Sequence, residues 1–216
     1  MRLDGSSKDL LNKRTLFFPR YHQLDVVRRL VDHAAHYGVG HTYLIQHSAG
    51  SGKSNSITWA AYQLIEAYPA TNDVHGSHGI DQPLFDSVIV VTDRRLLDKQ
   101  LRENIKEFSE VKNIIAPANK SSELKSALEN GKKIIITTIQ KFPFIVDGIS
   151  DLSDKRFAVI IDEAHSSQSG TAHSKMNEAM GKTEEEAEDI QDLILQSMQS
   201  RKMRGNASYL AFTATP

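Results

Sequence analysis

The sequence of 216 residues contains no cysteine, a single tryptophan and few aromatic residues. The lack of cysteine excludes a disulfide framework and a thiolate metal site, and nothing points to secretion. Neither sign of charge is in excess, because the chain contains 26 Lys and Arg and 27 Asp and Glu. Whole-chain charge therefore gives no indication of nucleic-acid binding, although a motor can hold a nucleic-acid backbone through a few loops.

Long hydrophobic runs are missing as well. No uninterrupted apolar stretch is long enough to cross a bilayer, and the N-terminal residues 1–8 lack the apolar core of a signal peptide. Apolar residues make up 39% of the chain and charged residues 25%, the balance of a soluble globular protein with a full core. We therefore expect a cytoplasmic protein that has no contact with a membrane.

Short apolar segments alternate with longer amphipathic ones along the chain. After a lead-in segment of residues 1–19, apolar periodicity predicts helices at residues 20–37, 53–68, 94–108, 123–130 and 184–202. Apolar, mostly β-branched runs predict strands at residues 42–46, 87–92, 113–116, 133–137, 157–161 and 208–212. Strands that alternate with helices form parallel sheets. The sequence therefore predicts one α/β domain over residues 20–216, with a parallel sheet flanked by helices on both faces.

The most informative stretch is the predicted strand at residues 42–46 with the sequence His-Ser-Ala-Gly-Ser-Gly-Lys-Ser that follows it at residues 47–54. Gly50, Ser51 and Gly52 form a turn in which the glycines allow backbone conformations closed to other residues. Consecutive N–H groups and the positive end of the next helix then make a cradle for phosphate. An ordinary turn before a helix is the alternative interpretation.

Two side chains of this phosphate loop, here defined as residues 47–54, carry its expected chemistry. Lys53 would reach the β- and γ-phosphates of a nucleotide, and the Ser54 hydroxyl would ligate Mg²⁺. The match to the general P-loop pattern is incomplete, because His47 stands where the first glycine belongs. We nevertheless interpret the loop as a nucleotide-phosphate site.

A pair of carboxylates follows the predicted strand at residues 157–161. Open parallel sheets place their ligand sites at the C-terminal ends of strands, where Asp162 and Glu163 stand. Asp162 is suited to hold Mg²⁺, usually through water, and Glu163 to orient or deprotonate an attacking water. The pair is also compatible with a simple helix cap. Together with the phosphate loop, it predicts half of a nucleoside-triphosphatase site.

These motifs in this order resemble the first RecA-like domain of a superfamily 2 helicase or translocase. More closely, they resemble the motor (restriction, or R) subunit of type I restriction enzymes, in which His47 is itself typical. The resemblance covers about residues 18–216, and the combination of motifs is specific. The similar stretches are Phe18-Pro-Arg-Tyr-His-Gln23, Gln46-His-Ser-Ala-Gly-Ser-Gly-Lys-Ser54, Val91-Thr-Asp-Arg94 with Leu97-Asp98 and Gln100, Thr137-Thr-Ile-Gln-Lys-Phe142, Ile161-Asp-Glu-Ala-His165 and Ala211-Phe-Thr-Ala-Thr-Pro216.

The resemblance implies a RecA-like P-loop domain that binds ATP and Mg²⁺. By that resemblance Gln23 would contact the adenine edge, with Arg20 beside it. Loops 70–83 and 166–182 would lie near the nucleotide or the nucleic acid. The residues that would touch the nucleic-acid backbone without reading sequence are Thr92, Arg94, Thr137, Thr138 and Gln140. The residues that would couple the nucleotide state to the nucleic acid are His165, Thr213 and Thr215.

The resemblance also implies partners. The family's motor acts on duplex DNA and needs a second RecA-like domain, which supplies an arginine finger across the cleft, and a nuclease domain in the same full-length chain. Sequence recognition belongs to a separate specificity subunit, which works with a methyltransferase subunit. We therefore expect residues 20–216 to be the motor domain of a longer protein, and the isolated fragment to be inactive or very weak.

Two other functions remain open from the sequence. One is an RNA helicase of the Asp-Glu-Ala-His type, although the forms Val91-Thr-Asp-Arg94 and Thr213-Ala-Thr-Pro216 favour the restriction motor. The other is a non-catalytic module that only binds nucleotide or DNA. The histidine pair His33 and His36 has the i, i+3 spacing of metal ligands, but no carboxylate or third ligand completes a site. A solvated helix surface is the preferred interpretation of that pair.

Overall fold

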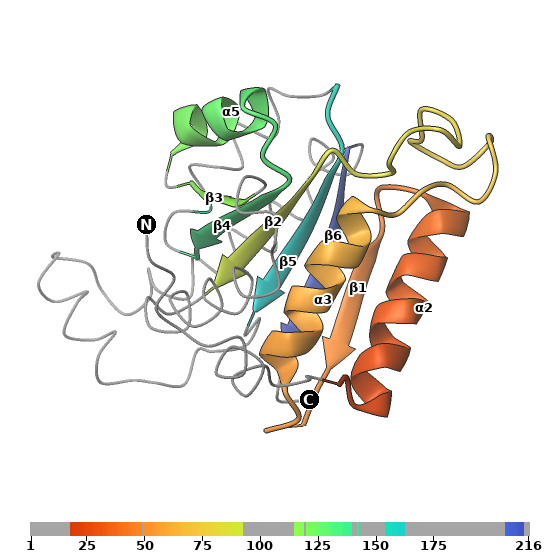
Figure 1. The fold of residues 1–216 in the computed structure, drawn as a ribbon, viewed down its shortest axis with the longest axis vertical. Coiled ribbons are helices and arrows are strands. Elements are labelled where there is room, and N and C mark those ends of the chain that lie inside the picture. Colours follow the sequence, from red (N-terminus) through yellow and green to blue (C-terminus); the bar gives the residue numbers. More distant parts are fainter. Residues whose placement is uncertain are drawn as a thin grey trace, which may run out of the picture.

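The structure, a computed structural model, describes residues 18–48, 50–92, 115–118, 120–139, 142, 154–162 and 206–213. Within these residues, the helices and strands lie close to the positions that the sequence predicts (Figure 1). The elements, in chain order, are α2 (Tyr21–Tyr37), β1 (Thr42–Gln46), α3 (Lys53–Ile65), β2 (Ser87–Thr92), β3 (Ile115–Pro117), α5 (Ser121–Glu129), β4 (Ile134–Thr138), β5 (Phe157–Asp162) and β6 (Ala207–Thr213). The helices predicted at residues 94–108 and 184–202, and loop 166–182, lie outside the described residues.

The six described strands form one sheet in the order β1-β6-β5-β2-β4-β3, and every described pairing is parallel. The prediction of a parallel sheet is therefore confirmed. Because β6 lies between β1 and β5, the last described strand of the chain separates the strand of the phosphate loop from the strand that ends at Asp162. Parallel pairing directs all carboxyl ends to one edge of the sheet (Figure 1).

The sheet is buried on both faces, as near-continuous apolar strands require. Helices α2 and α3 pack on one face, and α5 packs on the other, so the predicted cover of both faces is also confirmed (Figure 1). The strand side chains buried beneath α2 and α3 include Val88, Val90, Ile134, Ile136, Ala158, Ile160, Leu210 and Phe212. Those buried on the face of α5 include Ile89, Val91, Ile135, Phe157, Val159, Ile161 and Tyr209. Successive side chains along each strand therefore face opposite sides of the sheet, and this alternation determines which of them can reach a site on either side.

The predicted end of the helix after the phosphate loop is wrong, and so is the expectation that loop 70–83 lies near the nucleotide, whereas proximity of that loop to nucleic acid stays a prediction. The helix ends at Ile65 rather than at residue 68, because the chain turns there and the carbonyl of Ala67 accepts a hydrogen bond of 2.7 Å from the Leu84 amide. Loop 70–83 does not lie near the predicted nucleotide site. It packs against the C-terminal end of α2, where the Val39 amide donates to the His75 carbonyl at 3.0 Å, at the edge of the sheet opposite the phosphate loop (Figure 1).

Candidate functional site

The phosphate loop connects β1 to α3 at the carboxyl edge of the sheet. Gly50 and Gly52 have φ angles of 74° and 84°, in the left-handed region that favours glycine. Gly52 directly precedes α3, and its carbonyl accepts hydrogen bonds from the amides of Asn55 and Ser56 at 3.0 and 3.3 Å. The predicted need for glycine at both positions is therefore confirmed, and the helix starts at Lys53.

Lys53 and Asp162 come together at this edge. The Lys53 Nζ atom lies 3.1 Å from the Asp162 Oδ1 atom, and both side chains are largely removed from solvent. Asp162 is the last residue of β5 and is 3% exposed. A carboxylate at this depth needs a compensating charge, which the ammonium group of Lys53 provides. The two residues that the sequence assigned to phosphate and Mg²⁺ thus form one charged centre.

Gln23, which family resemblance assigned to adenine, is bound to the phosphate loop. Its Nε2 atom donates to the carbonyl oxygens of Ser51 at 2.9 Å and Gly52 at 3.1 Å, and its Oε1 atom accepts from the backbone N–H of Arg20 at 2.8 Å. The side chain is 2% exposed. A buried amide with its donor and acceptor both engaged holds its neighbours firmly. Gln23 therefore connects the start of α2 to the loop, and adenine recognition by Gln23 and Arg20 stays a prediction.

Two histidines also hold Ser51. The Nδ1 atom of His47 lies 3.0 Å from the Ser51 hydroxyl oxygen, and His22 Nε2 donates to the Ser51 carbonyl at 3.1 Å. Burial lowers the pKa of His47, and the positive charges of His22 and Lys53 lower it further. The His47 imidazole is therefore neutral at physiological pH. The sequence marked His47 as a departure from the general P-loop pattern that is typical of the resembling family, but it gave His47 no contact and His22 no role, because no sequence spacing signals these contacts.

The threonines assigned to nucleic acid and coupling end neighbouring strands. Thr92 and Thr138 are register partners at the ends of β2 and β4, and the Thr92 carbonyl accepts from the Ile139 amide at 2.9 Å. Thr92, Thr137 and Thr138 are all buried, so none presents its side chain to solvent in this structure. Thr213 ends β6 and pairs with Gln46 of β1. The assigned residues that lie outside the described part of the chain are Arg94, Gln140, Glu163, His165 and Thr215.

The residues at this edge fit a magnesium–nucleotide. The turn at Gly50 and Gly52 leads directly into α3, whose first turn offers backbone N–H groups and positive potential to a phosphate. Lys53 adds a cation, and Asp162 adds a carboxylate in contact with it. Ser54 lies in the first turn of α3, where its hydroxyl completes the set of donors that such ligands require. The arrangement is thus chemically suited to binding a nucleoside triphosphate at its phosphates.

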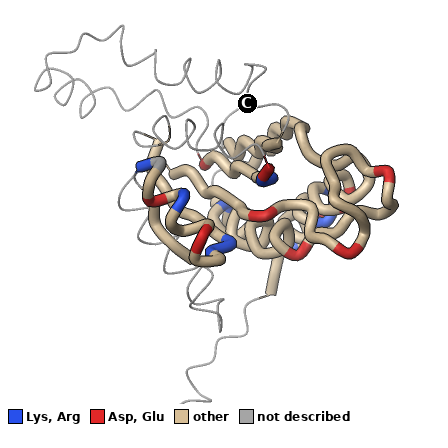
Figure 2. The backbone as a smooth tube through the Cα atoms, turned by 90° about the horizontal axis from the view of Figure 1, so that it is seen from above, with Lys and Arg blue, Asp and Glu red and all other residues tan. Residues whose placement is uncertain are grey.

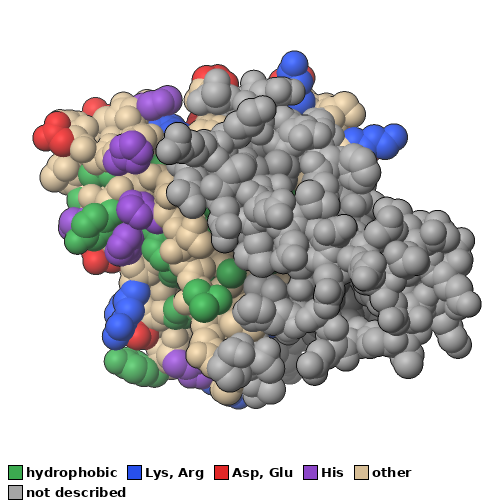
Figure 3. Space-filling model, turned by 180° about the vertical axis from the view of Figure 1, so that it is seen from behind, with side chains coloured by type: hydrophobic (Ala, Val, Ile, Leu, Met, Phe, Trp, Pro, Cys, Tyr) green, Lys and Arg blue, Asp and Glu red, His purple; other side chains and the backbone are tan. Residues whose placement is uncertain are grey.

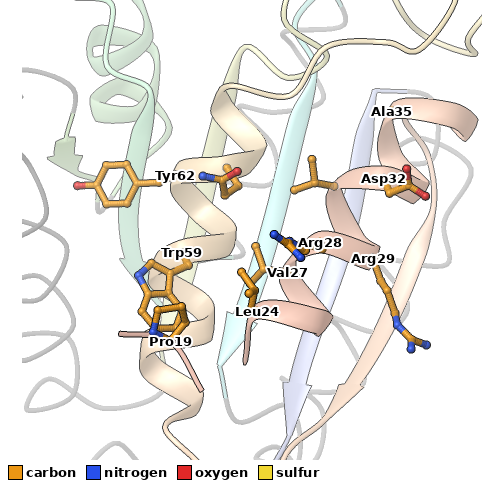
Figure 4. Close-up of a pocket in the computed structure, with 11 residues that line it drawn as sticks. Pro19, Leu24, Val27, Arg28, Arg29, Asp32, Ala35, Trp59 and Tyr62 are labelled. Atoms are coloured by element: carbon orange, nitrogen blue, oxygen red, sulfur yellow. The ribbon is translucent and has the colours of Figure 1, made fainter. Parts of the chain in front are cut away.

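A separate groove of about 930 Å³ lies between α2 and α3, on their outward side (Figure 4). Its lining combines apolar and charged side chains and contains no residue of the phosphate loop. The lining residues are Pro19, Leu24, Val27, Arg28, Arg29, Val31, Asp32, Ala35, Trp59, Tyr62 and Gln63. The groove therefore does not belong to the charged centre at Lys53 and Asp162.

Histidine and tyrosine side chains gather where α2 meets β1, on a surface visible in Figure 3. His33 stacks on Tyr37 with ring centroids 4.4 Å apart, and its Nδ1 atom shares a hydrogen bond of 3.0 Å with the Tyr43 hydroxyl. His36 instead donates to the Asp32 carbonyl at 2.8 Å. Among the residues that the structure describes, no group of three or more His, Cys, Asp or Glu is placed to hold a metal ion. This cluster packs α2 against β1.

Charge is mixed along the described part of the chain, where Lys and Arg alternate with Asp and Glu (Figure 2). The only large charge centre buried at the carboxyl edge, among the described residues, is the Lys53–Asp162 pair. None of the described helices is long and apolar enough to cross a membrane. The buried charged groups described at the carboxyl edge therefore lie at the phosphate loop and at the end of β5.

Known proteins resemble this chain in sequence. The chain is 25% identical over 202 residues to the type I restriction enzyme SsaAORF53P endonuclease subunit of Staphylococcus saprophyticus. The aligned segment covers 91% of this chain and 17% of that subunit. It is 28% identical over 142 residues to the C-terminal part of a putative type I restriction enzyme MpnIIP endonuclease subunit of Mycoplasma pneumoniae, with 62% of this chain and 61% of that protein covered. The chain thus spans less than two thirds of the length of either relative.

A solved structure and a family match complete the comparison. The nuclease-deletion mutant of the type ISP restriction-modification enzyme LlaGI, solved with a DNA substrate mimic, has a TM-score of 0.55 and 14% identity, over 94% of this chain and 18% of that one. That likeness shows the fold, which is RecA-like as the sequence predicts. Residues 22–187, most of the chain, match the family described as SWI2/SNF2 ATPase. The chain therefore belongs to the SWI2/SNF2 ATPase family.

Proposed function

We propose that this chain is the ATP-binding half of the DNA-translocating motor of a type I restriction endonuclease, and that it forms part of a longer protein. The observation that carries the proposal is the 3.1 Å contact of Lys53 with Asp162, which unites a phosphate loop and an acidic strand end in one site. The relatives named as type I restriction enzyme endonuclease subunits support the restriction role. Their greater length supports a larger parent protein.

Each residue at the edge has a part in the proposed hydrolysis. The backbone of residues 50–54 would bind the phosphates, and Lys53 would balance the charge that grows on them. Ser54 and Asp162 would hold Mg²⁺, which supplies further charge neutralisation when bound. Glu163 would orient or deprotonate the water that attacks. Because these groups stabilise charge by position, the rigidity of the loop matters as much as its composition.

Coupling to DNA would use the neighbouring strand ends. Contacts to the DNA backbone position a protein without reading sequence, which suits a motor that must pass over any sequence. The proposed backbone contacts are Thr92, Arg94, Thr137, Thr138 and Gln140, and the proposed coupling residues are His165, Thr213 and Thr215. A second RecA-like domain would supply an arginine that speeds hydrolysis by about 10³–10⁵-fold. A nuclease domain and the methyltransferase and specificity subunits would complete the enzyme.

The test is ATP hydrolysis by the full-length protein with duplex DNA, with RNA and without nucleic acid, beside its Lys53→Ala variant. Partner subunits are added if duplex DNA must be loaded by them. We expect duplex DNA to raise the hydrolysis rate, and the Lys53→Ala variant to lose both hydrolysis and nucleotide affinity.

Other outcomes would assign a different function to the protein. Stimulation by RNA but not by duplex DNA would identify a helicase of the Asp-Glu-Ala-His type and remove the DNA roles from Arg94 and Gln140. If the nucleotide affinity of Lys53→Ala were unchanged, the phosphate loop would not be the nucleotide-binding site. Nucleotide binding without hydrolysis under any of the conditions would leave a binding module.

A further inference from the structure

His47 occupies a position in the phosphate loop that general P-loops give to glycine, and the structure shows four contacts there. Its backbone N–H donates to the Thr213 carbonyl at 2.8 Å, and its Nδ1 atom lies 3.0 Å from Ser51 Oγ. Its ring stacks on Phe212 at 5.9 Å between centroids, with 24° between the planes, and faces His22 edge-on at 6.0 Å. The side chain is 5% exposed. His47 thus joins the loop to the end of β6.

We propose that His47 is a positioning residue that fixes Ser51 of the phosphate loop against the end of β6, so that nucleotide binding at the loop is transmitted to Thr213. This inference rests on the proposed function, because Thr213 couples to DNA only if the protein is a DNA motor. The positioning of Ser51 can nevertheless be tested on nucleotide binding alone.

The physical argument compares histidine with the glycine of the general pattern. Glycine at position 47 would keep the backbone hydrogen bond to Thr213 and lose all three side-chain contacts, with Ser51 Oγ, the Phe212 ring and the His22 ring. Glycine also gives the chain more conformations, so the loop would lose order before the nucleotide binds. A loop that is already ordered binds more tightly, because less freedom is lost on binding. The imidazole therefore preorganises the loop.

The geometry identifies Nδ1 as the nitrogen that acts. His47 Nε2 is buried and has no hydrogen-bond partner in the described part of the chain, whereas Nδ1 reaches Ser51. Asparagine places an amide atom near the position of Nδ1, and glutamine places one near Nε2. His47→Asn should therefore preserve the Ser51 contact, and His47→Gln should not, although both remove the ring. These two variants separate the hydrogen bond from the volume of the side chain.

The first experiment is a double-mutant cycle on the dissociation constant of a fluorescent ATP analogue, in the full-length protein. His47→Gly and Ser51→Ala should each weaken binding about two- to tenfold, the range expected for one hydrogen bond between neutral groups. Combined, they should weaken it no more than the worse single change, because both remove one interaction. His47→Asn should restore most of the affinity. The proposal would be overturned if the two single changes weakened binding independently, so that their effects multiplied in the double variant. It would also be overturned if His47→Gln restored the affinity and His47→Asn did not.

The second experiment measures kcat and KM for ATP with and without saturating duplex DNA. The variant His47→Gly should raise KM and should also lose most of the stimulation by DNA, which a loss of affinity alone would not cause at saturating ATP. The matched control is His33→Asn, a half-buried histidine in the cluster of α2 and β1, which should change neither quantity. Stimulation in His47→Gly equal to wild type would disprove transmission to Thr213.

The two experiments keep the inference apart from the proposed function. A wild-type protein that does not respond to DNA would contradict the DNA motor and with it the transmission to Thr213. The double-mutant cycle would still decide whether His47 positions Ser51, since it needs only nucleotide binding. A thermal melt of each variant shows that the comparison is made between folded proteins.

Discussion

The ammonium nitrogen of Lys53 lies 3.1 Å from a carboxylate oxygen of Asp162. Lys53 begins α3, which follows β1, and Asp162 ends β5, although β6 lies between β1 and β5 in the sheet. Each side chain neutralises the other in a place that is largely closed to water. In the proposed function, a magnesium–nucleotide would bring a phosphate anion for Lys53 and a cation for Asp162. The two side chains would then give up their contact with each other when the nucleotide binds.

That relationship predicts different effects for the two members of the pair. Asp162→Asn should lower kcat for ATP hydrolysis by about 10²–10³-fold, because Asp162 would hold the Mg²⁺ that neutralises charge on the reacting phosphate. Its nucleotide dissociation constant should change only a few-fold, since Lys53 and the loop remain. Lys53→Ala should lose binding and hydrolysis together. Hydrolysis assays combined with binding titrations check this split, and equal loss of affinity in both variants would contradict it.

A second prediction compares the two glycines of the loop without nucleotide. Gly50→Ala should cost about 1–2 kcal/mol, because alanine disfavours a φ of 74° although no atom of the described chain lies within 4 Å of the added methyl. Gly52→Ala should cost more, since its methyl meets the Gln23 amide and displaces it from the loop. Thermal melts of the two variants give the comparison. An equal loss of stability would show that the Gln23 contact contributes nothing.

The position of Gln23 leads to a third prediction about base selectivity. Gln23→Glu preserves the shape of the side chain but turns a carboxylate toward the carbonyl oxygens of Ser51 and Gly52, so ATP affinity should fall. Because the wild-type amide is bound to the loop, GTP affinity should fall by the same factor. Titrations with both nucleotides measure this. A change in the ratio of ATP to GTP affinity would instead support adenine recognition by Gln23.

A fourth prediction concerns the opposite edge of the sheet, where Asp86 Oδ2 accepts hydrogen bonds from Arg156 N at 2.9 Å and from Arg156 Nε at 3.0 Å. Asp86→Asn should lower the free energy of unfolding by about 1–3 kcal/mol, because the largely buried guanidinium group loses its partner. The control is Asp25→Asn, which removes an exposed pair with Arg29 and should change stability by less than about 1 kcal/mol. Urea unfolding measures both.

The same pair sets a dependence on pH. Burial acts to raise the pKa of Asp86, but the hydrogen bonds and charge of Arg156, together with the charge of Lys155, leave it lower than normal. A lowered pKa in the folded state means that the stabilisation is complete above the unfolded pKa of about 3.9 and is lost as pH falls through the folded value. The stability difference between wild type and Asp86→Asn should therefore be constant from about pH 7 to 5 and shrink below about pH 4.

The sequence by itself determined the alternation of strands and helices, the phosphate loop and the acidic strand end. These features depend on short-range physical chemistry: β-branched apolar runs, helical periodicity, and glycines at Gly50 and Gly52 where the backbone needs a positive φ. Such signals are read from neighbouring residues, so strands β2 and β5 were predicted to within a residue. Local signals also misplaced the end of α3, because tertiary contact at Ala67 stops that helix.

Only the tertiary structure decided which residues meet. Strand order is set by contacts between segments far apart in the chain, so no local pattern shows that β6 lies between β1 and β5. That order places Phe212 and Thr213 beside His47, and the packing of α2 on α3 brings His22 and Gln23 to Ser51. Loop 70–83 lies at the far edge because α3 runs from the phosphate loop to that edge (Figure 1). The sequence contains the groups proposed to bind phosphate, and the sheet order with the packing of α2 determines which side chains hold the loop in place.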